Sequence, residues 1–545
     1  MRKKSMRKNI HLKFLQNRIV NDLNKKGARH MVTKIMSIGL NGVEGYRVQV
    51  EVQIVEGIEV FVIVGLPDAS VKESKERVTA ALHSLGEPIV DKKIVVNLSP
   101  AEQKKNGPLF DVAMAIAILK SIKAIKVEIP ATTCFIGALS LDGSILPFEG
   151  MLAAALASKK LGFTHLYMPF NPDLPEIKME GMEIVFVSSL TEVLQHLAGQ
   201  QILPTYVPTN TADEEIVYDK DFSHIIGHEF AKRALEVAAA GEHHVFLSGP
   251  PGCGKSMLAE TFPSILPPLS NEAQLEKVSL FQLAGLDYGG VNIPVFRNPH
   301  HSASSVSIIG GGTNPKPGEI SLAHRGVLFL DEMAEFSKKT LDMLRQPIET
   351  GKVTISRVRS TVTYPAKFLL IGAMNPCPCG YLGSKTHYCT CTLKQIQSYQ
   401  NRISGPIRDR FDISLHLQSV PIEQKKQLIS EPSAVIRKRV IAARESQYER
   451  YGMELCNGRA TYETLMKTNN LSDKIKQLIQ QMTLKKKWSN RVQIKIIRLA
   501  RTIADLREEL QITEEALWEA IVLSRTQDEQ LKDRKKIGIR ESGLL

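Results

Sequence analysis

The sequence has no long apolar run, no secretion signal and few cysteines. No stretch reaches the ~18 apolar residues that a transmembrane helix needs, and the first thirty residues lack an apolar signal core with a cleavage site. The seven cysteines are an odd number, so a disulfide framework is not expected. Hydrophobic residues at 43% and charged residues at 23% exclude disorder throughout. We expect a cytoplasmic globular protein with no membrane partner.

The chain has little net charge outside its first thirty residues. Residues 1–30 supply +9 of the formal +13, which leaves +4 for the remaining chain. Global basicity therefore says little about the folded body, and binding of nucleic acid has to be argued from local sites. Within residues 1–30, Leu12, Leu15, Ile19 and Leu23 could form one face of a basic helix. This extension is either a functional basic arm or an appended start, with the body opening at Met31.

Hydrophobic periodicity divides the remaining chain into α/β and helical parts. Residues 46–64 alternate as two strands around Gly57, and strands then alternate with helices to about residue 200. A polar, proline-bearing linker covers 201–222. The prediction is an α/β domain over 31–200, a second α/β domain over 223–421 with a parallel sheet, a helical domain over 422–525 and a tail over 526–545.

The strongest chemical signal is a glycine-rich loop between an apolar strand and a helix start. The segment "VFLSGPPGCGKS" has the P-loop spacing G-x-x-x-x-G-K-S in its required context. Such a loop cradles phosphates with its backbone N–H groups, while its lysine reaches the β- and γ-phosphates and its serine ligates Mg²⁺. The predicted ATP-binding residues are Gly249, Pro250, Pro251, Gly252, Cys253, Gly254, Lys255 and Ser256.

Two further buried strands end in polar side chains. The strand "GVLFL" ends in Asp331 and Glu332, and "KFLLIGAM" ends in Asn375. Asp331 can hold Mg²⁺ together with Ser256, and Glu332 can orient and activate the attacking water. Asn375 can lie beside the γ-phosphate and help to place that water. Neighbouring strand ends at one edge of a parallel sheet are where such sheets bind ligands.

Four of the seven cysteines fall within fifteen residues. Cys377, Cys379, Cys389 and Cys391 follow Asn375 directly, in the loop 377–391. Four thiolates suit a tetrahedral Zn²⁺, although the C-x-C spacing is tighter than usual and His387 could replace one sulfur. Unligated, reduced thiols are the alternative.

The order of these motifs is similar to that of AAA+ ATPases of the magnesium-chelatase-like group. More narrowly, residues 33–525 resemble the YifB/ComM family in long stretches such as "NPHHSASSVSIIGGG", "KPGEISLAHRGVLFLDEMAEF" and "AMNPCPCGY". The resemblance implies a ring-forming ATPase that acts on DNA, with a hexamer as the expected ring. It makes Arg410 of "DRFD" the arginine finger and Arg491 of "SNRVQIKIIRLARTIADL" the sensor on the helical lid. The chain departs from the family at His228 and Arg408.

The family resemblance also implies a function on DNA. The best-known member of the family is a branch-migration helicase that aids the integration of incoming DNA during natural transformation. The expected partner is therefore single-stranded or branched DNA, bound without sequence preference. The β-hairpin pattern of "GKVTISRVRSTVTYP" carries Lys352, Arg357 and Arg359, and in related ring helicases a hairpin before the sensor strand points into the pore. A second candidate is the insertion with Arg297, His300 and His301. A solvated charged hairpin is the alternative.

The first α/β domain resembles the Lon-protease fold. The Lon pattern places a catalytic serine after Gly-Pro and a lysine in a later stretch, where this chain has Leu109 and Leu152. A Ser–Lys dyad needs a hydroxyl and an amine, so we expect an inactive domain that serves assembly or partner binding.

Three functional hypotheses follow from the motifs and the resemblance. The first is an ATP-driven DNA motor. The second is a magnesium-chelatase-type motor for tetrapyrrole metal insertion, and the third, an ATP-dependent protease, is disfavoured by the two leucines.

Overall fold

The computed structural model describes residues 32–524 except 88, 173, 175–178, 201–217, 313–314, 358–359, 385–386, 420–429 and 470. The predicted basic extension and tail, and most of the predicted linker, lie outside this part of the chain. The chain divides into two compact units, Met1–Asn210 and Thr211–Leu545, and each is described by itself. Within the described part, no helix is both long and apolar enough to cross a membrane.

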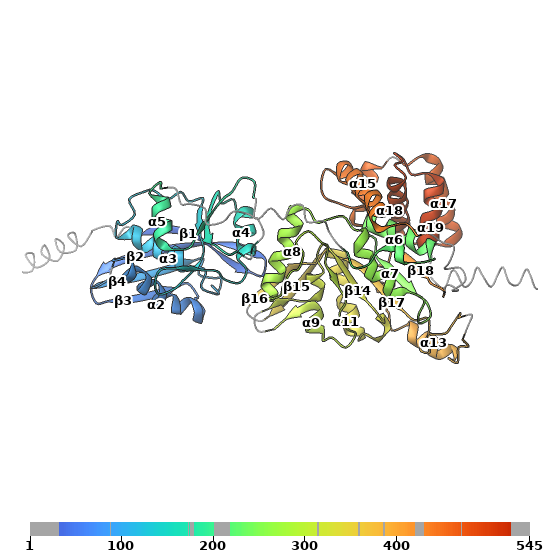
Figure 1. Cartoon of the computed structure of the whole chain (residues 1–545), viewed down its shortest axis with the longest axis horizontal. Helices are drawn as coiled ribbons and strands as arrows, with labels where there is room; N and C mark the ends of the chain where they lie inside the picture. The colour runs from blue at the N-terminus through green and yellow to red at the C-terminus, as the bar shows by residue number, and fades with distance from the viewer. Residues whose placement is uncertain are drawn as a thin grey trace, which may run out of the picture. The chain divides into compact units, whose positions relative to one another are not determined.

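The first unit is an α/β fold built on a seven-stranded mixed sheet, drawn in blue to green in Figure 1. Alternating apolar residues produce its long antiparallel strands, in which every second side chain is buried. The two strands predicted around Gly57 form, but they are not neighbours, because the later strand β4 lies between them. In sheet order the strands are β3 (Val60–Val64), β4 (Lys92–Ser99), β2 (Glu44–Glu56), β1 (Thr33–Asn41), β5 (Thr133–Phe135), β8 (His165–Pro169) and β9 (Glu183–Val187).

The helices of the first unit supply its apolar core. The predicted apolar helix after the Gly-Pro pair is the most buried of them, and it packs against β1 and β2. Its residues from Asp111 to Leu119 are all buried. The helices are α2 (Ala69–Ser84), α3 (Asp111–Ser121), α4 (Met151–Lys160) and α5 (Leu190–Leu197), and a small hairpin is formed by β6 (Ala138–Leu139) and β7 (Ile145–Leu146).

The second unit is built on a five-stranded sheet whose neighbouring strands are all parallel. The inner strands β14 and β17 are buried at every position, as expected for continuous apolar runs in a parallel sheet covered on both faces. In sheet order the strands are β11 (Phe296–Arg297), β14 (Val327–Leu330), β17 (Leu369–Met374), β10 (Val245–Ser248) and β18 (Ile413–His416).

Helices and two hairpins surround this sheet. The hairpin predicted before the sensor strand is confirmed by six antiparallel residue pairs. The helices are α6 (Glu229–Gly241), α7 (Lys255–Thr261), α8 (Asn271–Ala284), α9 (Ser305–Ile309), α10 (Glu319–Leu322), α11 (Lys338–Met343), α12 (Arg345–Thr350), α13 (Leu393–Gln400) and α14 (Gly405–Arg408). The hairpins are β12 (Gly310–Gly311) with β13 (Lys316–Pro317) and β15 (Lys352–Arg357) with β16 (Ser360–Pro365). Short 3₁₀ helices are η1 (Phe222–His224), η2 (Phe262–Ile265) and η3 (Met333–Glu335).

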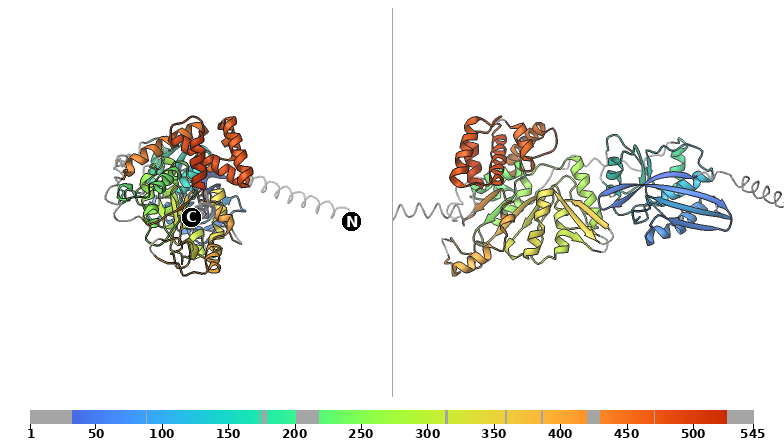
Figure 2. Two further views of the ribbon diagram at one scale, coloured as in Figure 1. Left: turned by 90° about the vertical axis from the view of Figure 1, so that its right-hand side faces the viewer. Right: turned by 180° about the vertical axis from the view of Figure 1, so that it is seen from behind.

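The described chain from Ser430 onward is helical, as predicted. Its helices gather as one group, in orange to red, when the molecule is seen from the front and from behind (Figures 1 and 2). Helices α15 and α18 pack on α6 of the sheet domain, and buried Ala238, Val440 and Leu499 belong to one continuous apolar cluster. The helices are α15 (Ser433–Tyr451), α16 (Tyr462–Thr468), α17 (Asp473–Lys486), α18 (Asn490–Leu506) and α19 (Glu514–Ser524), with η5 (Asn457–Arg459) between the first two.

Candidate functional site

The P-loop lies between β10 and α7, in the strand–loop–helix context that its sequence requires. Ser248 ends the strand and Lys255 begins the helix. Gly254 caps the helix with φ +88°, a left-handed conformation that residues with a side chain adopt only at a cost. The ring of His228, one of the two departures from the family, lies close by: a Cβ on Gly254 would be 3.7 Å from its Nε2.

Lys255 is a buried cation held by oxygen atoms. Its Nζ donates hydrogen bonds to the carbonyl oxygens of Gly249 (2.8 Å) and Pro250 (3.0 Å), and to Oδ1 of Asn375 (3.1 Å). Burial lowers the pKa of Lys255, against the opposing charges around it. Lys255 and Asn375 are thus in contact although 120 residues of sequence separate them. This contact was expected because Lys255 follows β10 and Asn375 follows β17, and these parallel strands end at the same edge of the sheet. A phosphate at this place would offer the ammonium a charged partner in exchange for two carbonyls.

The two residues predicted to hold Mg²⁺ lie next to each other. The hydroxyl of Ser256 donates to Oδ2 of Asp331 at 2.8 Å, and the other carboxylate oxygen of Asp331 accepts from the backbone N–H of Glu332 at 2.8 Å. A hydroxyl and a carboxylate at this spacing are oxygen ligands of the kind that Mg²⁺ prefers. The residues therefore fit the metal.

Glu332 leaves the end of β14 in an unusual conformation. Its φ is +46° and its carboxylate is 55% exposed, so the side chain is accessible to a solvent molecule or a ligand. A left-handed conformation costs a non-glycine residue roughly 1–2 kcal/mol. Nδ1 of His301 lies 3.5 Å from its Oε2, and the rings of His300 and His301 are 4.1 Å apart. We did not predict this neighbour from the sequence, although the His-His pair follows β11, the strand beside β14.

The two predicted arginines meet at a shared carboxylate. Arg410 and Arg491 both donate through Nη2 to Oε1 of Glu349, the latter at 3.3 Å. All three line a cavity of about 400 Å³ whose described lining contains no P-loop residue, no strand-end acid and not Asn375. Burial, and then the charge of Arg491, lower the pKa of Arg410. Nε and Nη1 of Arg410 are buried and have no hydrogen-bond partner in the described chain.

Two residues of the predicted DNA hairpin, Lys352 and Arg357, lie at opposite ends of it. Lys352 is exposed and pairs with Pro365 at the base of the hairpin, whereas Arg357 pairs with Ser360 at the other end. Five residues of strand place their backbones roughly 16 Å apart. The side chain of Arg357 and the whole of Arg359 lie outside the described part of the chain.

The residues of the second candidate DNA-binding segment, Arg297, His300 and His301, each contact other side chains of the second unit. Nε and Nη2 of Arg297 donate to the two carboxylate oxygens of Glu319 at 2.6 and 2.7 Å, a two-pronged pair that fixes the guanidinium. His300 contacts Ser302, and His301 faces Glu332. Arg297 and His301 thus connect the insertion to other elements of the second unit, whereas the contact of His300 is within the insertion itself.

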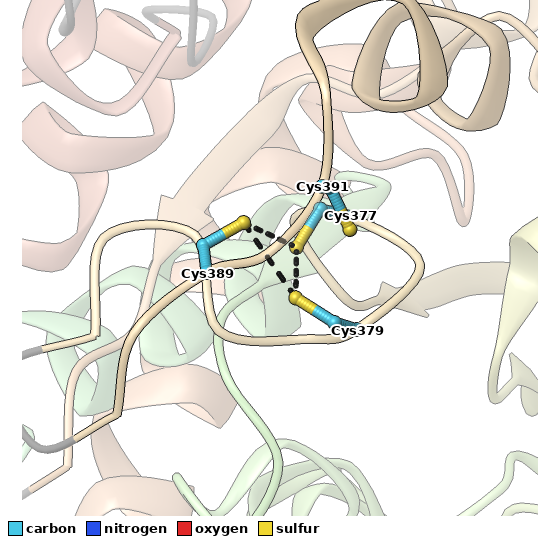
Figure 3. A group of neighbouring side chains, drawn as sticks. All are labelled: Cys377, Cys379, Cys389 and Cys391. Atoms are coloured by element: carbon cyan, nitrogen blue, oxygen red, sulfur yellow. Dashed lines mark hydrogen bonds between the residues drawn. The ribbon is translucent and has the colours of Figure 1, made fainter.

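The four clustered cysteines lie together between β17 and α13 (Figure 3). Their Sγ atoms all lie within 4.8 Å of one another, and this group does not include His387. The His387 ring instead stacks on Tyr381, with centroids 4.7 Å apart. The backbone N–H of Tyr381 is the first of several hydrogen bonds that lower the pKa of Cys379.

The two Lon positions of the first unit are occupied by packing residues. Leu109 is 4% exposed and Leu152 is fully buried. Neither side chain can donate or accept a proton, so these positions provide no nucleophile or base.

Three family models match successive parts of the chain. One described as magnesium chelatase, subunit ChlI, matches residues 221–425; one described as subunit ChlI of Mg-chelatase matches 50–172; and one described as its C-terminal part matches 430–524. The fold and these matches define an AAA+ protein of the magnesium-chelatase-like class.

Similarity over nearly the whole chain gives the family within this class. The chain is 38% identical over 485 residues to the YifB protein of Salmonella typhimurium, which covers 88% of this chain and 94% of the relative. It is also 38% identical over 489 residues to the competence protein ComM of Haemophilus influenzae, covering 88% and 95%. The chain therefore belongs to the YifB/ComM family. A Lon protease of Lachnoclostridium phytofermentans is 28% identical over 174 residues, 30% of this chain and 21% of that protein.

Proposed function

We propose that the chain is an ATP-hydrolysing motor that assembles into a hexameric ring and moves branched or single-stranded DNA in recombination and natural transformation.

 The observation that carries the ATPase is the meeting of Lys255, Asn375, Ser256 and Asp331 at one edge of a parallel sheet. These residues follow the ends of three strands, β10, β14 and β17, that are far apart in the sequence.

Each residue at this edge has a chemical role in the proposal. Lys255 binds the β- and γ-phosphates, and Ser256 and Asp331 hold Mg²⁺, which neutralises phosphate charge when bound. Glu332 accepts a hydrogen bond from the attacking water and orients it, because its carboxylate is exposed at the strand end beside the phosphate site. Asn375 helps to place the same water. His301, 3.5 Å from Glu332, holds that carboxylate when no nucleotide is bound.

The two arginines serve the nucleotide of a neighbouring subunit. They lie in a cavity that no described P-loop residue lines, and two buried donors of Arg410 have no hydrogen-bond partner among the residues that the structure describes. Glu349 shows that both guanidiniums reach one anionic oxygen at the same time. A γ-phosphate offered by an adjacent subunit would take the place of this carboxylate, and positive charge from the neighbour would stabilise the transition state. An assembled ring is therefore part of the mechanism.

The case for DNA rests on the family and on the place of the β15–β16 hairpin in the chain. One of the full-length relatives is a competence protein. The hairpin begins at Lys352, three residues after Glu349, and leads through Lys367 directly into β17 and Asn375. A movement of the hairpin along DNA is thus connected to both halves of the nucleotide site. Its cations would contact the phosphate backbone without reading sequence.

A DNA-binding experiment tests the proposal. Replacing Lys352, Arg357 and Arg359 by Ala should weaken binding to unrelated DNA sequences equally, flatten its salt dependence, and abolish stimulation of ATP hydrolysis by DNA. Replacing Lys338, Lys339 and Lys394, three exposed lysines on α11 and α13 of the same domain, is the matched control for lost positive charge. A triple variant that binds and moves branched DNA like the wild type would remove the hairpin from the mechanism.

A magnesium-chelatase-type motor remains the second candidate, because all three family models are described for that enzyme's ChlI subunit. The full-length similarity to YifB and ComM favours the first. ATP hydrolysis measured with branched DNA, and separately with a porphyrin and Mg²⁺, distinguishes the two, since each motor is expected to respond only to its own substrate.

A further inference from the structure

The four cysteines of the loop after Asn375 have the geometry of a metal site. The Sγ of Cys377 is 3.4 Å from that of Cys379 and 3.7 Å from that of Cys389, and the last two are 3.6 Å apart (Figure 3). Four sulfurs at the usual Zn–S length of about 2.3 Å in a tetrahedron lie about 3.8 Å from one another. The Sγ of Cys391 is within 4.8 Å of the other three. The sulfurs therefore already surround a space of the right size.

Local hydrogen bonds organise the backbone on both sides of the cysteine cluster. The backbone N–H of Leu382 donates to Cys377 Sγ at 3.3 Å, a bond that stabilises a thiolate. The N–H of Gly380 donates to the Cys377 carbonyl at 2.9 Å, which closes a turn between the first two cysteines. On the other side, Thr392 and Gln395 form a capping box that starts α13 directly after Cys391. Each C-x-C pair is thus held by its own local structure.

We propose that Cys377, Cys379, Cys389 and Cys391 bind one Zn²⁺, and that this metal fixes the position of the nucleotide-binding loop. An all-sulfur set excludes the hard cations Mg²⁺ and Ca²⁺ and favours zinc. The metal joins the end of β17 to the start of α13, in addition to the hydrogen bond that Nε2 of Gln400 in α13 donates to the carbonyl oxygen of Pro376 at 3.1 Å.

The loop contacts the P-loop at one glycine. A Cβ built on Gly380 would lie 2.8 Å from both Cγ and Cδ of Pro251, so the backbone of Gly380 lies against the Pro251 ring with no room for a side chain between them. Asn375, which accepts a hydrogen bond from Lys255, lies two residues before Cys377. The metal-bound loop therefore presses on the P-loop from one side and carries the sensor asparagine on the other. This second half of the proposal rests on the proposed ATPase.

Metal analysis of the full-length protein tests the first half. The purified wild type should contain about one zinc per chain, and Co²⁺ exchanged for it should give the absorption of tetrahedral cobalt thiolate. Cys389→Ser together with Cys391→Ser should lose the metal. Cys391→His, which supplies a nitrogen ligand, should keep it, and Cys456→Ala, at a buried cysteine outside the group, is the control. Wild-type protein that takes up neither metal, or that holds these cysteines as disulfides, would overturn the site.

Two glycine variants in the same loop test the second half. Gly380→Ala and Gly383→Ala both place a side chain at a φ near +80°, but only the first meets Pro251, since a Cβ on Gly383 finds its nearest neighbour at 4.0 Å. Both should retain zinc. Only Gly380→Ala should raise the KM for ATP, by several-fold. Equal kinetics would overturn the contact while leaving the metal site intact, and a zinc-loaded wild type that hydrolyses no ATP would overturn the proposed function instead.

Discussion

Both units are α/β folds, but their buried polar side chains differ in whether a charged partner within the same unit already binds them. In the first unit, the positions that carry a dyad in Lon are buried leucines, and its most buried acid, Asp111, is fully engaged by Arg77 at 2.7 Å and by the N–H of Leu139 at 3.2 Å. In the second unit, polar side chains lie at three strand ends, and the partners of Lys255 are neutral carbonyl and amide oxygens.

The charge of Asp111 therefore has a structural partner, whereas the charge of Lys255 is available to a ligand. A buried acid whose oxygens already accept hydrogen bonds from an arginine and a backbone N–H gains little from binding a ligand. A buried lysine without a direct carboxylate partner gains from an added anion. Two domains of the same α/β class therefore differ in function because of a few side chains at strand ends, not because of their layers.

The largest expected effect is in the nucleotide site of the second unit. Glu332→Gln should reduce ATP turnover on the order of 10²–10⁴-fold while ATP still binds, because the group that orients water is lost and Lys255 remains. Lys255→Ala should instead weaken nucleotide binding. Turnover and ATP affinity, measured separately, distinguish the two variants. Wild-type turnover in Glu332→Gln would exclude the assigned role.

The corresponding change in the first unit should affect stability alone. Leu152→Ala removes a fully buried side chain and should lower the free energy of unfolding of that unit by roughly 2–5 kcal/mol. Hydrogen exchange of α4 in the full-length protein measures this change. Leu141→Ala, at a residue 61% exposed, is the matched control. If Leu152→Ala left α4 as protected as before but abolished ATP hydrolysis, the contrast between the two units would fail.

The sequence alone predicted those parts of the site that each lie on one continuous motif. The P-loop, Asp331 with Glu332, and Asn375 follow apolar strands, and parallel strands bring their ends to one edge whatever the loops do. The strand and hairpin patterns were confirmed for the same local reason. The order of strands in the first sheet was not predictable, because β4 pairs with β2 through contacts that no local pattern specifies.

The contacts between distant side chains could not be predicted. Glu349 binds arginines 61 and 142 residues away, and His301 reaches Glu332 only because β11 and β14 are neighbours. Lys352 and Arg357, which were expected to act together on the DNA hairpin, have their backbones at its opposite ends, because Lys352 pairs with Pro365 and Arg357 with Ser360. Such contacts depend on the tertiary fold.

Loss of Arg410 should lower the rate of ATP hydrolysis less than loss of Glu332, and the effect should depend on a neighbouring subunit. Arg410→Ala should still assemble but hydrolyse ATP on the order of 10²-fold more slowly, by analogy with the loss of one donor to a developing charge. Mixing it with Lys255→Ala should restore part of the activity, because some interfaces then combine an intact P-loop with an intact arginine. ATP turnover across mixing ratios measures this. If no mixture exceeds the single variants, the arginine does not act on a neighbouring subunit.

The smallest expected effect is a pH dependence of opposite sign in the two units. In the second unit, burial acts to raise the pKa of Glu242, but Arg459 and Arg444 outweigh it and lower the pKa to about 2. Because a carboxyl with a lowered pKa binds its proton less readily when folded, its contribution is complete above its ordinary value of 4.5 and is lost as the pH falls toward 2.

In the first unit, burial raises the pKa of Asp111 above its ordinary value of 3.8, in spite of Arg77. The folded state then binds a proton at this carboxyl more readily than the unfolded state does. Protonation of Asp111 therefore increasingly favours the folded state as the pH falls toward the ordinary value of 3.8. Hydrogen exchange between pH 6 and pH 3, resolved by unit, should show the second unit losing protection first. Glu242→Gln should flatten that loss, since the titrating group is gone, whereas Glu319→Gln, at an acid with a single arginine partner, should leave it steep. Parallel loss of protection in both units, unaffected by Glu242→Gln, would show that other carboxyls govern acid unfolding.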